Sequence, residues 1–282
     1  MSGSHLVLNR FFTQYVFEDL LQHQTNSTYR TAVRRYLGEE TVGRNAEIIG
    51  KLYRYMVKNY RNEYIYQNTL FNKLLLGRHS MNTTTALTQV PIGGSKADFV
   101  LINGKATVYE IKTELDGLER LEGQVSDYYK AFDHVCVVTC QDSYERLKLR
   151  LADTPVGIVI LSSRSTLQWK KEPKTCQRHL SHEALFKILR KQEYVQVLTA
   201  YFGEAPQATP AFFYEACLER FLNIPLQIAY TLVLEQLKKR NPVRREYYDK
   251  VPYELKSLMY FYRASCRDYG KLFEFLNHEY RG

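Results

Sequence analysis

Cysteine is scarce in this chain, and its spacing matches no metal or disulfide motif. Five cysteines stand singly, with no C-x-x-C pair and no histidine pair at the spacing of zinc ligands: Cys136, Cys140, Cys176, Cys217 and Cys266. Neither a disulfide framework nor a structural zinc site is indicated. We expect reduced thiols and a fold held together by its apolar core.

Long apolar runs are also missing. No stretch of eighteen or more apolar residues occurs, and the first twenty residues lack a basic head followed by an apolar segment. We therefore expect a cytoplasmic protein that does not use a membrane. Its 282 residues, 45% of them apolar, suffice for one substantial core with helical additions.

Positive charge is in excess. Lysine and arginine number 39 against 30 acidic residues, giving a net charge of +9. This excess favours an anionic partner such as nucleic acid, because basic side chains that neutralise phosphates release bound counterions. Basicity alone fits a solvated surface as well, and the cluster Lys238–Arg240 is equally typical of a helix end.

The apolar pattern divides the chain into three regions. Helical spacing over residues 1–77 predicts an N-terminal helical region that contributes to the core, with Gly77 as its stop. Residues 78–175 alternate like strands, broken by Gly93-Gly94 and by the hairpin signal Asn103-Gly104. Residues 176–282 again read as helical.

The middle region predicts an α/β fold. Three strands in a meander are followed by a helix over about 118–132, a strand at HVCVVTC, a helix over about 143–151 and a strand at VGIVILSS. Strands that alternate with helices pack into a mixed sheet with helices against it. We expect a mixed central sheet flanked by helices.

Charged residues lie inside two apolar strands of this region. Asp98 follows Ala97 and precedes FVLI, and the triplet Glu110-Ile111-Lys112 ends the next strand. Side chains alternate along a strand, so Glu110 and Lys112 share one face while Ile111 points into the core. Carboxylates in such strands need a partner.

Two partners are consistent with the residues. A hard divalent cation would be held by carboxylate oxygens, a backbone carbonyl such as that of Ile111, and waters, which suits Mg²⁺. An internal ion pair, either Asp98 with Lys112 or Glu110 with Lys112, accounts for the same residues equally well.

Neighbouring helices add further candidates. Gln124 and Tyr128 are four residues apart and therefore share a helix face. A third carboxylate is expected from the N-terminal region, where Glu63 is preferred to Glu47. Glu63 also fits a helix-start glutamate stabilised by the helix dipole.

On these residues the chain resembles the PD-(D/E)XK nuclease superfamily, with its restriction-endonuclease-like core. Asp98 corresponds to the family's first acidic residue, Glu110-Ile111-Lys112 to its (D/E)-x-K triplet, and Glu63 to its helical acid. Gln124 and Tyr128 resemble the QxxxY element of RecB-type nucleases. Ala97 stands where the family has proline. Over most of its length, including EYIYQNTLFNKLLLG, the chain is similar to an uncharacterised bacterial and phage group.

The resemblance implies a Mg²⁺- or Mn²⁺-dependent nuclease, most simply one that acts on DNA in phage defence, restriction or repair. Asp98, Glu110 and Glu63 with the Ile111 carbonyl would hold the metal, and Lys112, Gln124 and Tyr128 would complete the catalytic site. Basic residues near the motif would bind phosphates: Lys73, Arg78, Lys96 and Lys130.

Two alternatives stay open. The chain could be a catalytically inactive nuclease-like protein that only binds nucleic acid, or an interaction protein whose motif is an ion-pair network. The C-terminal helical region could also mediate a homodimer or bind a protein partner. We expect Glu110→Gln to keep the fold, lose activity and relieve carboxylate repulsion.

Overall fold

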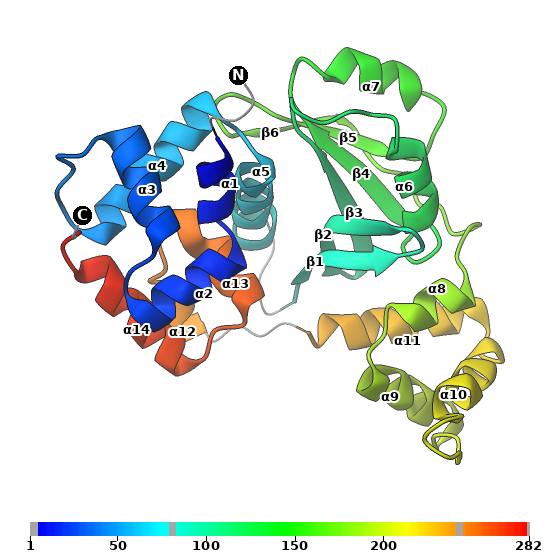
Figure 1. The fold of residues 1–282 in the computed structure, drawn as a ribbon. Helices are drawn as coiled ribbons and strands as arrows, with labels where there is room; N and C mark the ends of the chain where they lie inside the picture. Colours follow the sequence, from blue (N-terminus) through cyan, green and yellow to red (C-terminus); the bar gives the residue numbers. More distant parts are fainter. Residues whose placement is uncertain (1–4, 79–82, 241–244, 281–282) are drawn as a thin grey trace.

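The computed structural model describes residues 5–78, 83–240 and 245–280, which form a mixed sheet covered by helices on both faces (Figure 1). The N-terminal region holds α1 (Leu6–Phe11), α2 (Gln14–His23), α3 (Ser27–Leu37), α4 (Asn45–Asn59), α5 (Glu63–Leu70) and the π-helical η1 (Phe71–Arg78). The middle region holds β1 (Thr85–Ile92), β2 (Ser95–Asn103), β3 (Lys105–Lys112), α6 (Leu121–Tyr128), β4 (His134–Thr139), α7 (Tyr144–Arg150), β5 (Gly157–Leu161) and β6 (Leu167–Lys171).

The C-terminal region is helical, as its sequence predicts. It holds α8 (His182–Lys187), α9 (Lys191–Phe202), α10 (Phe213–Leu222), α11 (Leu226–Lys238), α12 (Arg245–Tyr248), the 3₁₀ turn η2 (Tyr253–Leu255), α13 (Lys256–Tyr262) and α14 (Cys266–Asn277). None of the helices in the described ranges is long and apolar enough to cross a membrane.

The sheet has six strands in sequence order, β1 to β6. β1, β2 and β3 form the predicted antiparallel meander, β4 and β5 add in parallel, and β6 returns antiparallel to β5. The predicted mixed α/β sheet is therefore confirmed. β6 was not predicted from the sequence, because its residues LQWKK, which alternate between half-buried and exposed, carry little apolar periodicity.

Both turns of the meander depend on glycine. Gly93 and Gly104 have φ of +60° and +69°, a region that glycine enters without strain. A Cβ at Gly93 would also come within 2.5 Å of a carboxylate oxygen of Asp127, a residue outside the meander that holds this turn. Asp127 accepts hydrogen bonds from the Gly94 amide and the Ser95 hydroxyl, which ties α6 to the β1–β2 turn.

Each face of the sheet buries its own core. On one face, the N-terminal helices and α12 to α14 pack against residues such as Phe99, Ile111 and Val138. On the other face, α6, α7 and α8 to α11 pack against residues such as Val108 and Val137. β4 is buried along its whole length between the two cores.

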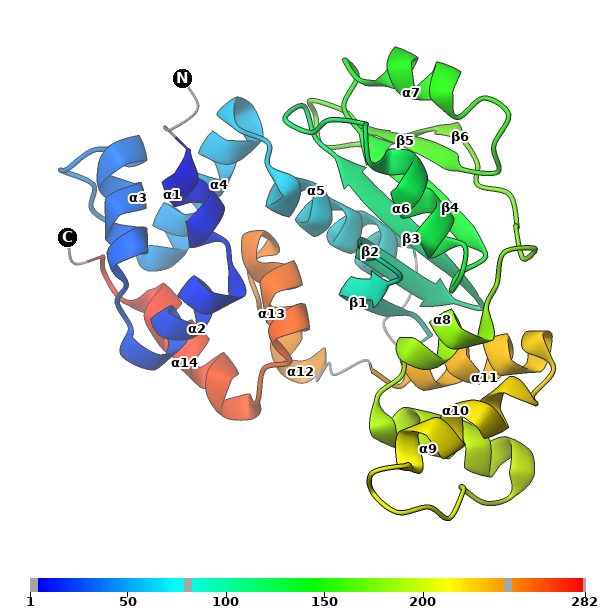
Figure 2. The same ribbon diagram turned by 45° about the vertical axis from the view of Figure 1, so that its right-hand side comes forward.

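The C-terminal helices divide between these two cores, as Figures 1 and 2 both show. α8 to α11 lie with α6 and the β1 end of the sheet, whereas α13 and α14 return to the N-terminal helices. The Asn45 side chain donates to the Phe275 carbonyl over 3.0 Å, and the Ser257 amide donates to Asn68 Oδ1 over 3.2 Å. The C-terminal region therefore belongs to two helical lobes, one formed by α8 to α11 and the other by the N-terminal helices with α12 to α14. Both lobes approach the edge strand β1.

Candidate active site

The charged triplet of β3 is arranged as strand alternation predicts. Ile111 belongs to the core on the α5 side, while Glu110 and Lys112 face α6 on the opposite side. Glu110 and Lys112 are only 1% and 6% exposed. Lys112 Nζ lies 2.9 Å from Glu110 Oε1, so the ion pair considered from the sequence exists within one strand.

Gln124 and Tyr128 of α6 complete this pair. Gln124 donates from Nε2 to Glu110 Oε1 over 2.6 Å and accepts from Lys112 Nζ over 2.8 Å. The Tyr128 hydroxyl donates to Glu110 Oε2 over 2.5 Å. Burial, with Glu110 alongside, raises the pKa of Tyr128, so the phenol stays a proton donor. Glu110, Lys112, Gln124 and Tyr128 thus form one network of hydrogen bonds and an ion pair, which we call the Glu110 network.

Asp98 lies near the Glu110 network on β2, at a position where the β1–β2 pairing is interrupted. Thr88 pairs with Phe99 and Val90 with Ala97, but the register skips Gln89 and Asp98. Gln89 has a left-handed φ of +52°, the conformation that locally distorts the edge strand. Asp98 Oδ2 accepts from the Ile111 amide over 2.9 Å, so the carboxylate stands in for a backbone acceptor between β2 and β3.

The surroundings of Asp98 oppose its negative charge. Burial, and then the carboxylates of Glu110 and Glu63, raise the pKa of Asp98 to about 8. The Ile111 amide and Lys112 act in the opposite direction but do not offset this. A buried acid that repels two neighbouring acids is a common feature of metal and catalytic sites.

Glu63 reaches the same place from the start of α5. Asn62 caps this helix by accepting from the Ile65 amide, and Glu63 is the first helical residue. Its side chain lines the open cavity and is exposed there. Partial desolvation, with Asp116 and then Glu110 nearby, raises the pKa of Glu63. Glu47, the competing candidate, lies in the first turn of α4 and does not line the cavity.

These residues line an open cavity of about 500 Å³, which contains Glu63, Asp98, Glu110, Ile111, Lys112 and Gln124. Two further residues of its wall were missed from the sequence. Asp116 accepts from the amide and hydroxyl of Thr113 in the loop after β3, and Arg120 precedes α6. Their only sequence signal was the charged run TELDGLER directly after the triplet.

Three of the predicted phosphate-binding residues, Lys73, Lys96 and Lys130, do not line this cavity. Lys73 is exposed on η1, and Lys96 is exposed on β2, but neither lines the cavity. Lys130 is paired with Asp127, Nζ to Oδ1, at 2.7 Å. The Arg78 side chain lies outside the described residues. Phosphate binding by these four residues stays a prediction from the sequence.

The donor atoms suit a magnesium ion bound through few protein ligands. Within the described ranges, no three Asp, Glu, His or Cys side chains are grouped closely enough to hold a metal by themselves. Mg²⁺ commonly binds one or two carboxylates and keeps several waters. Both oxygens of Glu110 already accept hydrogen bonds, so a cation would rely mainly on Asp98. A positive charge there would offset the burial and the carboxylate repulsion that raise the pKa of Asp98.

Fold and site together define an α/β protein with a buried carboxylate–lysine network that opens into a cavity beside an edge strand. The chain belongs to the bacteriophage P4 protein cII family, which it matches over residues 56–253, a range that includes the whole Glu110 network. Protein cII of Enterobacteria phage P4 is 28% identical over 109 residues, 38% of this chain and 40% of that protein. The alignment thus spans less than half of that relative's length. No solved structure matches this chain.

Proposed function

We propose that this protein is a metal-dependent nuclease of the PD-(D/E)XK type that hydrolyses phosphodiester bonds, with DNA as the favoured substrate. The observation that carries the proposal is the convergence of Asp98, Glu110 and Lys112 on one open cavity, with Gln124 placed between the last two. Its biological role would be in phage defence, restriction or repair. A homodimer or a protein partner through the C-terminal helices stays a prediction from the sequence.

Each residue of the site has a distinct part in this reaction. Bound Mg²⁺ or Mn²⁺ would polarise the scissile phosphate and lower the pKa of a bound water. Asp98, with the Ile111 carbonyl, would supply the main ligands, and Glu63 would add negative charge at the mouth of the cavity. Lys112 would orient the attacking water and counter the charge that develops on the phosphate, because Glu110 and Gln124 fix its ammonium in place.

A second candidate is a nucleic-acid-binding protein without catalysis. It is favoured by one observation: the Glu110 carboxylate already accepts from Lys112, Gln124 and Tyr128. Because both carboxylate oxygens of Glu110 have partners, the network needs no metal and could serve only to stabilise the fold. Both candidates bind nucleic acid, and they differ in whether the bound strand is cut.

The deciding experiment is cleavage of linear, circular and single-stranded DNA, and of RNA, in Mg²⁺, Mn²⁺ or EDTA. We expect metal-dependent cleavage that falls by about 10²- to 10⁴-fold in Lys112→Ala, the usual scale for a general acid–base group. Lys105→Ala is the matched control, because Lys105 is exposed at the other end of β3 and should leave the rate unchanged.

Cleavage that persists in Lys112→Ala would show that this site is not the catalytic one. Strand binding without cleavage in any metal would favour the second candidate. Both outcomes are read on protein whose melting temperature has been checked, because Lys112 is buried and its loss leaves Glu110 without an ion-pair partner.

A further inference from the structure

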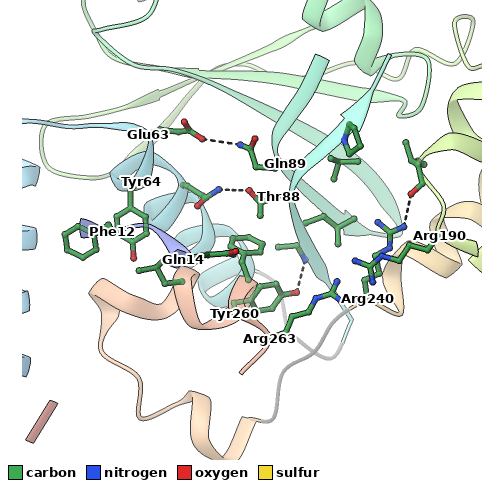
Figure 3. A pocket seen from close by; sticks show the side chains of 18 of the residues that line it. Phe12, Gln14, Glu63, Tyr64, Thr88, Gln89, Arg190, Arg240, Tyr260 and Arg263 are labelled. Atoms are coloured by element: carbon green, nitrogen blue, oxygen red, sulfur yellow. Dashed lines mark hydrogen bonds between the residues drawn. The ribbon is translucent and has the colours of Figure 1, made fainter. Parts of the chain in front are cut away.

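A larger groove adjoins the active-site cavity and runs along the edge strand β1. It encloses about 810 Å³, and residues Ala86 to Pro91 of β1 are part of its lining. Phe12, Glu63, Tyr64 and Gln67 line both the groove and the cavity, so the two hollows share a wall. Figure 3 shows Glu63 and Gln89 at one end of the groove and three arginines at the other.

The three arginines come from segments far apart in the sequence. Arg190 precedes α9, Arg240 follows α11, and Arg263 ends α13. Each lines the groove, and Figure 3 shows their side chains gathered at the same end. We call this group, which joins the two helical lobes, the arginine cluster.

The cluster carries more positive charge than the protein neutralises. Arg240 pairs with Glu193, Nε to Oε1 at 2.6 Å, and also donates to the Ile188 carbonyl over 2.8 Å. In the described ranges, neither Arg190 nor Arg263 has a carboxylate within ion-pair distance of its guanidinium. Among the described residues, Glu193 is thus the one carboxylate paired with the three arginines, which leaves two positive charges facing the groove.

Both the charge and the backbone conformation of Arg263 are energetically unfavourable. Partial burial, followed by repulsion from Arg190 and Arg240, lowers its pKa. Its backbone is also left-handed, with φ of +58°, a conformation that costs a non-glycine residue free energy. An anion between the guanidiniums would remove the repulsion, and a phosphate is the anion whose geometry suits several arginines at once.

Aromatic rings stand between the arginine cluster and the cavity. Phe12, Tyr64, Tyr260 and Phe261 all line the groove. The hydroxyl of Tyr64 donates to the Glu254 carbonyl, and that of Tyr260 accepts from the Ala86 amide, so both rings are fixed in place. Phe12, Tyr64 and Tyr260 are buried and form the floor of the groove, whereas Phe261 is only partly buried. Phe261 is thus the ring that can stack on a base, and a ring face beside a positively charged channel favours single-stranded nucleic acid, whose bases have open faces.

We infer that the arginine cluster binds a backbone phosphate of a single-stranded nucleic acid, whose chain then follows β1 into the active-site cavity. The path into the cavity rests on the proposed function, whereas phosphate binding by the arginines does not. The cluster would set the distance between a held phosphate and the phosphate that is cut.

The test is binding of a fluorescein-labelled oligothymidylate of about 20 nucleotides in EDTA, followed by fluorescence anisotropy at several salt concentrations. We expect Arg190→Ala and Arg263→Ala each to weaken binding by about threefold to tenfold. Each should lower the slope of log Kd against log salt by about 0.7, the value for one phosphate contact on a single strand. Arg240 is left intact, because its pair with Glu193 also stabilises α9.

The matched control is Arg164→Ala, which removes an exposed arginine at the β5–β6 turn that does not line the groove. Unchanged affinity and salt slope in both groove variants would overturn the inference. Preferential binding of duplex over single strand would overturn it as well, and so would inorganic phosphate that competes as strongly as the oligonucleotide at equal phosphate concentration.

Cleavage measured on the same variants separates this inference from the proposed nuclease. If no protein cuts any substrate but the groove variants lose affinity, the phosphate site stands and the nuclease does not. If the wild type cuts and the groove variants bind and cut equally well, the nuclease stands and the phosphate site does not.

Discussion

The hydroxyl of Tyr128 donates to Glu110 Oε2 over 2.5 Å and thereby fastens α6 to the charged face of β3. Removing the Tyr128 hydroxyl should leave the buried Oε2 atom of Glu110 without this hydrogen-bond donor. We expect Tyr128→Phe to lower the free energy of unfolding by about 1–3 kcal/mol and to reduce cleavage while strand binding stays unchanged.

Tyr129→Phe is the control for this change. Tyr129 is the next residue and equally buried, but its hydroxyl has no hydrogen-bond partner among the described residues. Its removal should be neutral or stabilising in a urea titration. Equal losses in the two variants would show that the Tyr128–Glu110 contact contributes nothing specific.

Glu110→Gln is a test on which sequence and structure disagree. Carboxylate repulsion alone suggests that the variant would be stabilised. The structure leads to the opposite expectation, because Glu110 is the ion-pair partner of buried Lys112. We expect a loss of roughly 1–3 kcal/mol in urea unfolding. Glu145→Gln, in the exposed pair with Lys148, should cause no measurable change. A Glu110→Gln protein more stable than wild type would contradict this account.

Magnesium should stabilise the protein through Asp98. A cation that binds only the folded state raises the melting temperature according to its affinity and concentration. We expect millimolar Mg²⁺ to raise the melting temperature of the wild type at pH 8 and to leave that of Asp98→Asn unchanged. The amide oxygen introduced by this substitution could still accept from the Ile111 amide, so the fold should survive the change. A magnesium shift of equal size in both proteins would place the metal elsewhere.

Asp133 should make stability depend on acid pH. Burial would raise its pKa, but hydrogen bonds from His134 and Tyr230 outweigh burial and hold the pKa below the ordinary 3.8. The unfolded chain then binds more protons between the two pKa values. The stabilisation is therefore present above pH 3.8 and is lost as the pH falls through the folded pKa.

Asp133→Asn should consequently be less stable than the wild type at pH 7, by about 1–2 kcal/mol. The difference should shrink as the pH falls below about 4, where an unfolded aspartate takes up its proton. Asp142→Asn, at an exposed position, should follow the wild type at every pH. A difference that is constant from pH 7 to pH 3 would show that the charge of Asp133 is irrelevant.

Val137 tests the placement of β4. Its side chain is fully buried between β4 and the helices on the α6 side. Val137→Asp would bury an unpaired carboxylate, and we expect a loss of about 4 kcal/mol or more. Gln168→Asp, on exposed edge strand β6, should stay folded with nearly the same melting temperature. A folded Val137→Asp protein would refute the central position of β4.

The local pattern of residues already determined much of the fold and part of the site. Alternation along β3 put Glu110 and Lys112 on one face, and the four-residue spacing put Gln124 and Tyr128 on one helix face. The glycine turns marked the meander. These features depend on neighbours a few residues apart, and the geometry of a strand, a helix or a turn fixes them directly.

The tertiary structure alone decided how these pieces meet. It inserted Gln124 between Glu110 and Lys112, left Asp98 unpaired in the β-ladder so that its carboxylate accepts from the Ile111 amide, and divided the C-terminal helices between two lobes. It also gathered Arg190, Arg240 and Arg263 around one groove. No periodicity relates residues so far apart, because their proximity depends on which apolar faces pack together across the whole sheet.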